Sequence, residues 1–101
     1  MEATIRKDDE RKVTLILDGR LDTAVTPQTE KEVEPLYAYE GYEIVIDCSR
    51  LEYISSSGLR IFLSIALDTQ SSGKHVVITG INDFVHNLFE MTGFTELFDY
   101  Q

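Results

Sequence analysis

The sequence predicts an α/β fold, with a small mixed β-sheet of four to five strands flanked by about three helices. Two apolar runs, residues 44–46 and 76–78, are unbroken, which is typical of strands buried on both faces. Between them, residues 57–71 carry apolar side chains at helical spacing, which indicates an amphipathic helix. This alternation, with short connections, favours a largely parallel sheet covered by helices.

The N-terminal part of the chain predicts two paired strands. Apolar residues alternate over residues 13–17, the period of a strand, and Asp18 and Gly19 then predict a turn. Residues 4–7 are expected to form a further strand that pairs antiparallel with residues 13–17.

A short helix is expected next, because Thr26 is suited to the N-cap and Pro27 to the first helical position. Pro35 removes a backbone hydrogen bond and clashes with the preceding turn. We therefore expect the helix to end near Glu34, followed by a kink or a new turn that stops before Gly41.

The central and C-terminal segments continue the alternation. Residues 43–48 predict a strand, a serine-rich loop follows, and the helix over residues 57–71 ends before Gly73, a plausible left-handed cap. Residues 75–79 predict another strand.

The last part predicts a helix and a short strand. Over residues 82–92, Phe84, Leu88 and Met91 are expected to form the buried face of an amphipathic helix. Residues 96–100 are expected to supply a last strand.

Size and composition limit the possible functions. The 101 residues suit a single domain over residues 1–101, and 43% of them are hydrophobic, enough for a core. A net charge of −9 would repel the phosphates of nucleic acids and an anionic membrane surface. Residues 1–12 lack the apolar core of a signal peptide, and residues 59–67 are too short to cross a bilayer. We expect a cytoplasmic protein without direct membrane insertion.

The serine-rich loop is the principal candidate site. Ser55, Ser56 and Ser57 lie between the carboxyl end of a predicted strand and the amino end of a predicted helix. Because the first N–H groups of a helix lack internal partners, an anion attached or bound there would be stabilised. One serine capping the helix, with the others filling a tight loop, is the structural alternative.

Nothing in the sequence predicts catalysis, a cofactor or a metal site. The G-x-S-x-G pattern of a hydrolase nucleophile and the P-loop pattern are both absent. His75 and His86 are distant from the serines in sequence, and Cys48, the only cysteine, is expected to be a buried hydrophobe.

Four segments together resemble a STAS domain of the anti-sigma factor antagonist type, a bacterial family, over roughly residues 4–100. They are GRLD at 19–22, VIDCSRLEYISSSGLR at 45–60, SGKHVVITGIN at 72–82 and VHNLFEMTGF at 85–94. The resemblance implies the small mixed sheet flanked by helices that the order of elements predicts. It also implies a regulatory protein without catalytic activity.

The resemblance further implies a switch in transcription regulation. The unphosphorylated form would bind an anti-sigma factor with serine kinase activity and free a sigma factor. Phosphorylation of Ser57, the serine before the Gly-Leu pair, would disrupt the complex, and a PP2C-type phosphatase would reverse it. Such a phosphoprotein is expected to be a monomer. The expected partner-binding residues are Asp22, Thr23, Ser55, Ser56, Gly58 and Leu59.

The sequence departs from the family pattern at two positions. Ser55 stands where the family has an aspartate, which leaves Ser56 as a second possible acceptor. Arg20 stands where an acidic or polar residue is frequent.

Three alternatives remain open at this point. In the first, the chain is an accessory STAS subunit of a membrane ABC-transport ATPase. In the second, it is a scaffold that is never phosphorylated. In the third, it is an enzyme or small-ligand binder with an anion site at the helix N-terminus. Arg60 is the only cationic residue close to the serines on their C-terminal side.

Overall fold

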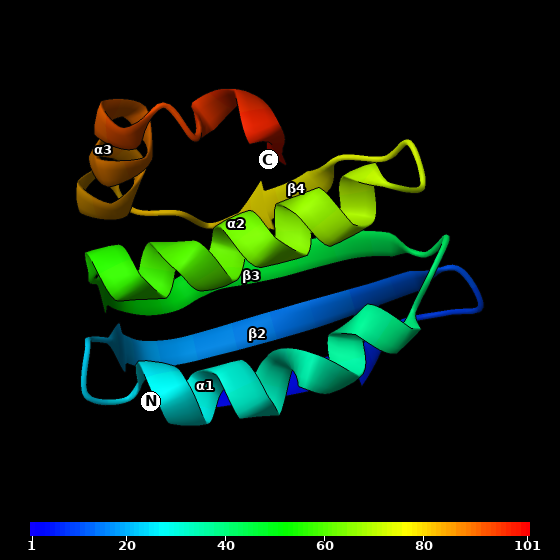
Figure 1. The fold of residues 1–101 in the computed structure, drawn as a ribbon, viewed down its shortest axis with the longest axis horizontal. Helices are drawn as coiled ribbons and strands as arrows, with labels where there is room; N and C mark the ends of the chain where they lie inside the picture. The colour runs from blue at the N-terminus through cyan, green and yellow to red at the C-terminus, as the bar shows by residue number, and fades with distance from the viewer.

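The computed structural model describes residues 1–101 and contains a five-stranded mixed sheet (Figure 1). The strand order is β1-β2-β3-β4-β5; β1 is antiparallel to β2, and all other pairs are parallel. The mixed sheet and the N-terminal antiparallel pair confirm the prediction. The strands are β1 (Glu2–Lys7), β2 (Lys12–Leu21), β3 (Glu43–Ile54), β4 (Val76–Thr79) and β5 (Phe98–Tyr100).

Three α-helices connect the strands, and α1 and α2 run side by side over one face of the sheet (Figure 1). The α-helices are α1 (Thr26–Val33), α2 (Ser56–Gln70) and α3 (Asp83–Thr92). Two 3-10 helices complete the fold, at Glu34–Ala38 directly after α1 and at Thr95–Leu97 before β5. The break between α1 and the first 3-10 helix confirms the kink predicted from Pro35.

One hydrophobic core lies between the helices and the sheet, and the predicted burial of the apolar strands on both faces is confirmed without a helix on the second face. Val45 and Val77 do not belong to the core cluster, yet each is only 7% exposed. Thr14, Val45 and Val77 are cross-strand neighbours, so they shield one another on the face that the core does not occupy. Continuous apolar strands therefore arise here without a second helical layer.

Three strands are longer than predicted: β1 begins at Glu2, two residues early, and β2 and β3 both extend further at their C-terminal ends. The turn expected at Asp18 and Gly19 is wrong, because β2 continues to Leu21 with register shifts against β3 on either side of these residues. Gly19 takes a positive φ of 112°, which a β-bulge accommodates while pairing continues. Residues 49–54, expected to lie in a loop, are part of β3, so the serines follow the strand directly.

The helix boundaries also differ from prediction at three places. Thr26 is not an N-cap, since Val25 occupies that position and Thr26 is the first residue of α1. The α2 helix begins at Ser56 and its C-cap is Ser71, although Gly73 has the expected positive φ of 79°.

The predicted buried face of α3 is wrong for Phe84 and Met91, whereas Leu88 is partly buried against the core. Val85 and Phe89 are fully buried, whereas Phe84 is 50% exposed and Met91 is 81% exposed. The ring of Phe62 in α2 lies 5.2 Å from that of Phe89, so packing against α2 determines which side of α3 faces the core.

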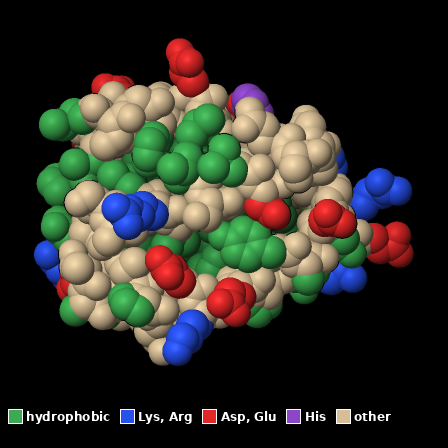
Figure 2. Space-filling view, in the orientation of Figure 1, with side chains coloured by type: hydrophobic (Ala, Val, Ile, Leu, Met, Phe, Trp, Pro, Cys, Tyr) green, Lys and Arg blue, Asp and Glu red, His purple; other side chains and the backbone are tan.

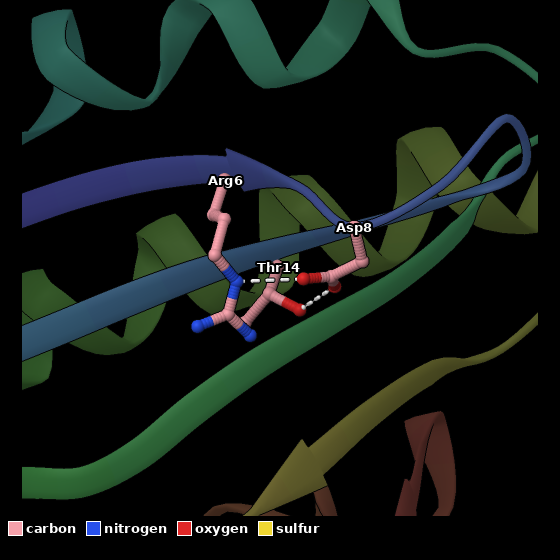
Figure 3. A network of polar contacts seen from close by, with 3 residues as sticks. All are labelled: Arg6, Asp8 and Thr14. Atoms are coloured by element: carbon pink, nitrogen blue, oxygen red, sulfur yellow. Dashed lines mark hydrogen bonds and ion pairs between the residues drawn. The ribbon is translucent and has the colours of Figure 1, made fainter.

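A polar network fixes the β1–β2 hairpin on the face of the sheet away from the core (Figure 3). The Nε of Arg6 donates to the carboxylate of Asp8 at 2.6 Å, and the hydroxyl of Thr14 donates to the other carboxylate oxygen. These hydrogen bonds, first that from Thr14 and then that from Arg6, lower the pKa of Asp8.

Cys48 is buried in the core as predicted, with 1% of its surface exposed. Burial, and then the nearby charge of Asp47, raises the pKa of the Cys48 thiol to about 12. Because the thiolate is the reactive form, we expect Ellman's reagent at pH 8 to modify the folded protein at least about 100-fold more slowly than the urea-unfolded protein. Immediate reaction under native conditions would contradict this buried placement.

Candidate functional site

Ser55 is the N-cap of α2, and its side chain is committed to that role. Its Oγ accepts a hydrogen bond from the N–H of Gly58 at 3.1 Å, and Ser55 is only 9% exposed. Its own N–H donates to the carbonyl of Leu21 at 2.9 Å, which ties the start of α2 to the end of β2. Serine and aspartate are both strong N-caps, so a serine at position 55 can cap α2 as well as an aspartate would.

The Ser57 hydroxyl lies within a cluster of four hydroxyl groups. Its Oγ is 3.0 Å from Oγ of Ser55, 3.3 Å from Oγ1 of Thr26 and 3.5 Å from Oγ1 of Thr23. These groups come from the start of α2, the start of α1 and the turn after β2. The three predicted residues Thr23, Ser55 and Ser57 are thus brought together, and Thr26 is added to them.

The direction of hydrogen bonding in this cluster follows from counting protons. Thr26 donates its only hydroxyl proton to the carbonyl of Asp22 at 2.8 Å, so at the contact between Thr26 and Ser57 the donor is Ser57. Ser57 is also the donor in its longer contact with Thr23, so its single proton is shared between the two threonines. Ser57 can then accept from Ser55. The hydroxyls form a chain from Ser55 through Ser57 and Thr26 to the Asp22 carbonyl, and each bond polarises the next.

Asp22 builds the turn that carries this chain. Its Oδ1 accepts a hydrogen bond from the N–H of Val25 at 3.2 Å, and its carbonyl accepts from Thr26. The carboxylate is partly buried, and Thr23, next to it, is exposed. Asp22 therefore has a structural role at the end of β2, and Thr23 is the more accessible of the two.

The predicted site residues differ in their access to a partner. Ser56 is exposed, Ser57 is partly buried, and both line a shallow depression with Thr23 and Arg60. Leu59, by contrast, is 4% exposed and belongs to the core. The side chain of Leu59 therefore packs in the core beneath the start of α2 and is not accessible to a partner.

Gly58 allows α2 to approach the end of the sheet. A Cβ at this position would lie 2.8 Å from Cγ of Leu21 and 3.0 Å from Cγ1 of Ile54, both closer than normal contacts. Only glycine therefore fits between α2 and these side chains without displacement. Local patterns in the sequence do not predict the contact of Gly58 with Leu21 or that of Thr26 with Ser57, because each joins segments more than 30 residues apart.

Replacing Gly58 with alanine is expected to destabilise the fold by about 1–3 kcal/mol, because the added methyl group overpacks the contact with Leu21. The sign of the change in unfolding free energy is diagnostic, because replacing glycine with alanine at an uncrowded helix position would stabilise the fold by about 0.5–1 kcal/mol. Urea unfolding would measure the change, with the exposed Ser56→Ala as the control in the same turn, expected within about 0.5 kcal/mol. A stabilised Gly58→Ala would contradict the close packing.

No general base accompanies the serines. His75 lies 3.6 Å from the carboxylate of Asp99 and His86 lies 3.3 Å from that of Glu90, and both pairs lie outside the serine cluster.

The structure contains no group of three or more His, Cys, Asp or Glu side chains arranged to hold a metal ion. None of its helices is long and apolar enough to cross a membrane. The arrangement fits a docking or modification site.

Comparison with known proteins agrees with this geometry. The family model described as "Mlab, STAS domain" matches residues 4–99. The anti-sigma-B factor antagonist of Listeria monocytogenes is 24% identical over 95 residues, which cover 94% of this chain and 83% of the relative. A putative anti-sigma factor antagonist of Bordetella bronchiseptica, BtrV, is 31% identical over 98 residues, covering 97% and 84%.

Solved structures show the same fold. The unphosphorylated anti-sigma factor antagonist SpoIIAA aligns with a TM-score of 0.80 at 16% identity, over 99% of this chain and 88% of that chain. The phosphorylated form of the Bacillus cell fate determinant SpoIIAA aligns with a TM-score of 0.74 at 15% identity, over 99% and 91%. The chain therefore belongs to the STAS domain family, and it resembles the anti-sigma factor antagonists within that family.

Proposed function

We propose that the chain is a phosphorylation-controlled regulatory module of the anti-sigma factor antagonist type, without catalytic activity of its own. In its unphosphorylated form it binds an anti-sigma factor with serine kinase activity and thereby frees a sigma factor. Phosphorylation of Ser57 ends this binding, and a PP2C-type phosphatase restores it. The observation that carries the proposal is the Ser57 hydroxyl at the second position of α2, on the rim of a surface depression.

The choice among the three serines rests on geometry and on the family pattern. Ser55 is buried and already caps the helix, so its hydroxyl is the least accessible. Ser56 and Ser57 both line the depression. Ser57 directly precedes Gly58, and the serine before this glycine is the acceptor position in the family pattern. Ser56 is the secondary candidate.

The physical effect of a phosphate at Ser57 falls on the partner and leaves the fold intact. Phosphorylation adds about −1.5 to −2 charges, and the N-terminus of α2 stabilises them through its free N–H groups and dipole. An interface that had packed against a neutral hydroxyl must instead accommodate a dianion. A poorly paired interfacial charge costs several kcal/mol, and each 1.4 kcal/mol weakens binding about tenfold.

The test is phosphorylation by the cognate anti-sigma kinase with ATP, followed by mapping of the modified residue by mass spectrometry. We expect one phosphate on the wild-type protein and on Ser56→Ala, and none on Ser57→Ala. Binding of the kinase to the phosphorylated protein should be at least about 100-fold weaker than to the unmodified protein. Stoichiometric phosphate outside residues 55–57, or unchanged modification of Ser57→Ala, would refute the proposal.

A second candidate uses the same surface without phosphate, as an accessory STAS subunit of a membrane ABC-transport ATPase or as a scaffold. The observation in its favour is that the Ser57 hydroxyl is already engaged with Ser55 and Thr26, so a partner can dock on this neutral cluster directly. Purification of the complex from source cells distinguishes the two. Recovery of a transporter ATPase in place of a regulatory kinase would favour this candidate.

A further inference from the structure

A stack of three side chains lies outside the hydrophobic core at the end of the sheet near the serines. The guanidinium carbon of Arg20 in β2 is 4.5 Å from the ring centre of Tyr53 in β3. The ring of Tyr53 in turn stacks on that of Phe84 in α3, with 5.7 Å between centroids and 24° between planes. Arg20 and Tyr53 are also paired across the two strands, so the backbone fixes their separation. We call these three residues the Arg-Tyr-Phe stack.

The stack is exposed, and it does not contribute to the core. Phe84 is 50% exposed, Arg20 is exposed, and neither aromatic ring belongs to the core cluster or packs against it. A fold gains little from holding a half-exposed phenylalanine in this position, whereas an exposed, ordered aromatic surface is typical of protein–protein contacts.

Arg20 retains unused hydrogen-bonding capacity. It forms no ion pair, unlike Arg6 and Arg50, and its guanidinium carbon lies over the ring of Tyr53. Stacking in this way leaves the N–H groups in the guanidinium plane free to bind a carboxylate in bidentate fashion. Arg60, which lines the depression at the serines, also forms no ion pair, so two unpaired arginines lie near this end of an otherwise acidic chain with 9 basic and 18 acidic residues.

The stack adjoins the serine site through the backbone. Arg20 is two residues before Asp22 and Tyr53 is two residues before Ser55, at the point where β2 and β3 both end. At about 3.3 Å per strand residue, this separation is about 7 Å along each strand. Leu21 and Ile54, the next residue along each strand, are buried against Gly58 of α2, so Arg20 and Tyr53 point to the opposite face of the sheet at the same end. A protein that wraps around this end of the sheet therefore contacts both surfaces.

We propose that the protein that docks on the serine site also covers the Arg-Tyr-Phe stack and places a carboxylate against Arg20. This extends the proposed function, on which it rests, by naming a second contact surface and the chemistry that it recognises. Arginine and tyrosine are enriched among residues that dominate binding energy, and a stack that is already ordered loses little entropy on binding. The net charge of −9 opposes a nucleic-acid base as the occupant.

Site-specific photocrosslinking in source cells tests the shared occupancy. A benzophenone amino acid would replace Thr23 at the serine site, Phe84 in the stack, or Leu67 as a control that is 54% exposed and lies in the last two turns of α2. We expect one and the same protein to be captured from positions 23 and 84 and not from 67.

The outcomes separate the two proposals. Capture from position 23 without capture of that protein from 84 would overturn the further inference and leave the proposed function standing. Absence of capture from both positions would overturn both. Capture from all three positions would show that the contact is not specific to the stack, and this result would also overturn the further inference.

Affinity measurements with the captured protein, once purified, test the chemistry. Arg20→Gln and Phe84→Ala should each weaken binding about tenfold or more, and Leu67→Ala less than about twofold. The Arg20→Gln variant should also show a weaker dependence of affinity on salt, because a charge pair is removed. Unchanged affinity of Arg20→Gln, with a circular dichroism melting curve like that of the wild type, would refute the carboxylate contact.

Discussion

Replacing Phe89 with alanine is expected to destabilise the fold by about 3–5 kcal/mol, enough to unfold a large fraction of a marginally stable small protein. Phe89 has no exposed surface, and its ring lies 5.2 Å from that of Phe62 and 5.4 Å from that of Phe98. Truncation leaves a cavity where α2, α3 and β5 meet, and neighbouring rings cannot collapse into it without breaking their own contacts. Urea unfolding monitored by circular dichroism would measure the loss.

The same substitution at Phe84 is the matched control, because both residues belong to α3. Phe84 is 50% exposed and outside the core, so Phe84→Ala is expected to cost less than about 1 kcal/mol. Equal losses at the two positions, or a larger loss at Phe84, would show that α3 packs through the face predicted from the sequence.

Replacing Gly80 with alanine is expected to destabilise the fold by about 3 kcal/mol or more, for two reasons that act together. Gly80 has a positive φ of 68°, which side chains other than glycine rarely adopt. A Cβ there would also lie 2.8 Å from Cβ, 2.9 Å from Cα and 2.9 Å from N of Ser49. Because two of these atoms are backbone atoms of β3, side-chain rotation cannot relieve the clash.

Gly73→Ala separates the two contributions. Gly73 has a similar φ of 79°, but no atom lies within 4 Å of the position that its Cβ would take. Only the backbone strain of a positive φ therefore destabilises Gly73→Ala. We expect its free energy of unfolding, measured by urea denaturation, to fall by about 1 kcal/mol. Similar losses of stability for Gly73→Ala and Gly80→Ala would show that the clash with Ser49 does not add to the destabilisation.

The two glycines illustrate how a local pattern differs from a tertiary requirement. Gly73 was predicted as a left-handed residue from its position after an amphipathic helix, and its positive φ agrees. The need for glycine at positions 58 and 80 had no local signal. In both cases the restriction comes in large part from a segment distant in sequence, Leu21 or Ser49.

The candidate site was predictable in part for the same reason. The serines could be placed between a strand and a helix because their neighbours carry clear apolar periodicity. The partners of the Ser57 hydroxyl could not be predicted, since Thr23 and Thr26 reach it from 31 or more residues away. Local sequence predicts only an N-cap role for Thr26, because capping depends on neighbouring residues.

The sequence by itself determined the order of elements, the mixed sheet, the kink at Pro35 and the position of the serine cluster, because each depends on local periodicity or on local backbone chemistry. The tertiary structure alone decided which face of α3 is buried. The stripe through Val85 and Phe89 and the stripe through Phe84 lie next to each other on the helix, and the contacts of Phe89 with Phe62 and Phe98 distinguish them. It also decided that β2 continues through Gly19, because pairing with β3 as far as Leu21 outweighs a local tendency to turn. In the same way, packing decided that Arg20, Tyr53 and Phe84, from three separate elements, form one exposed stack beside Ser55.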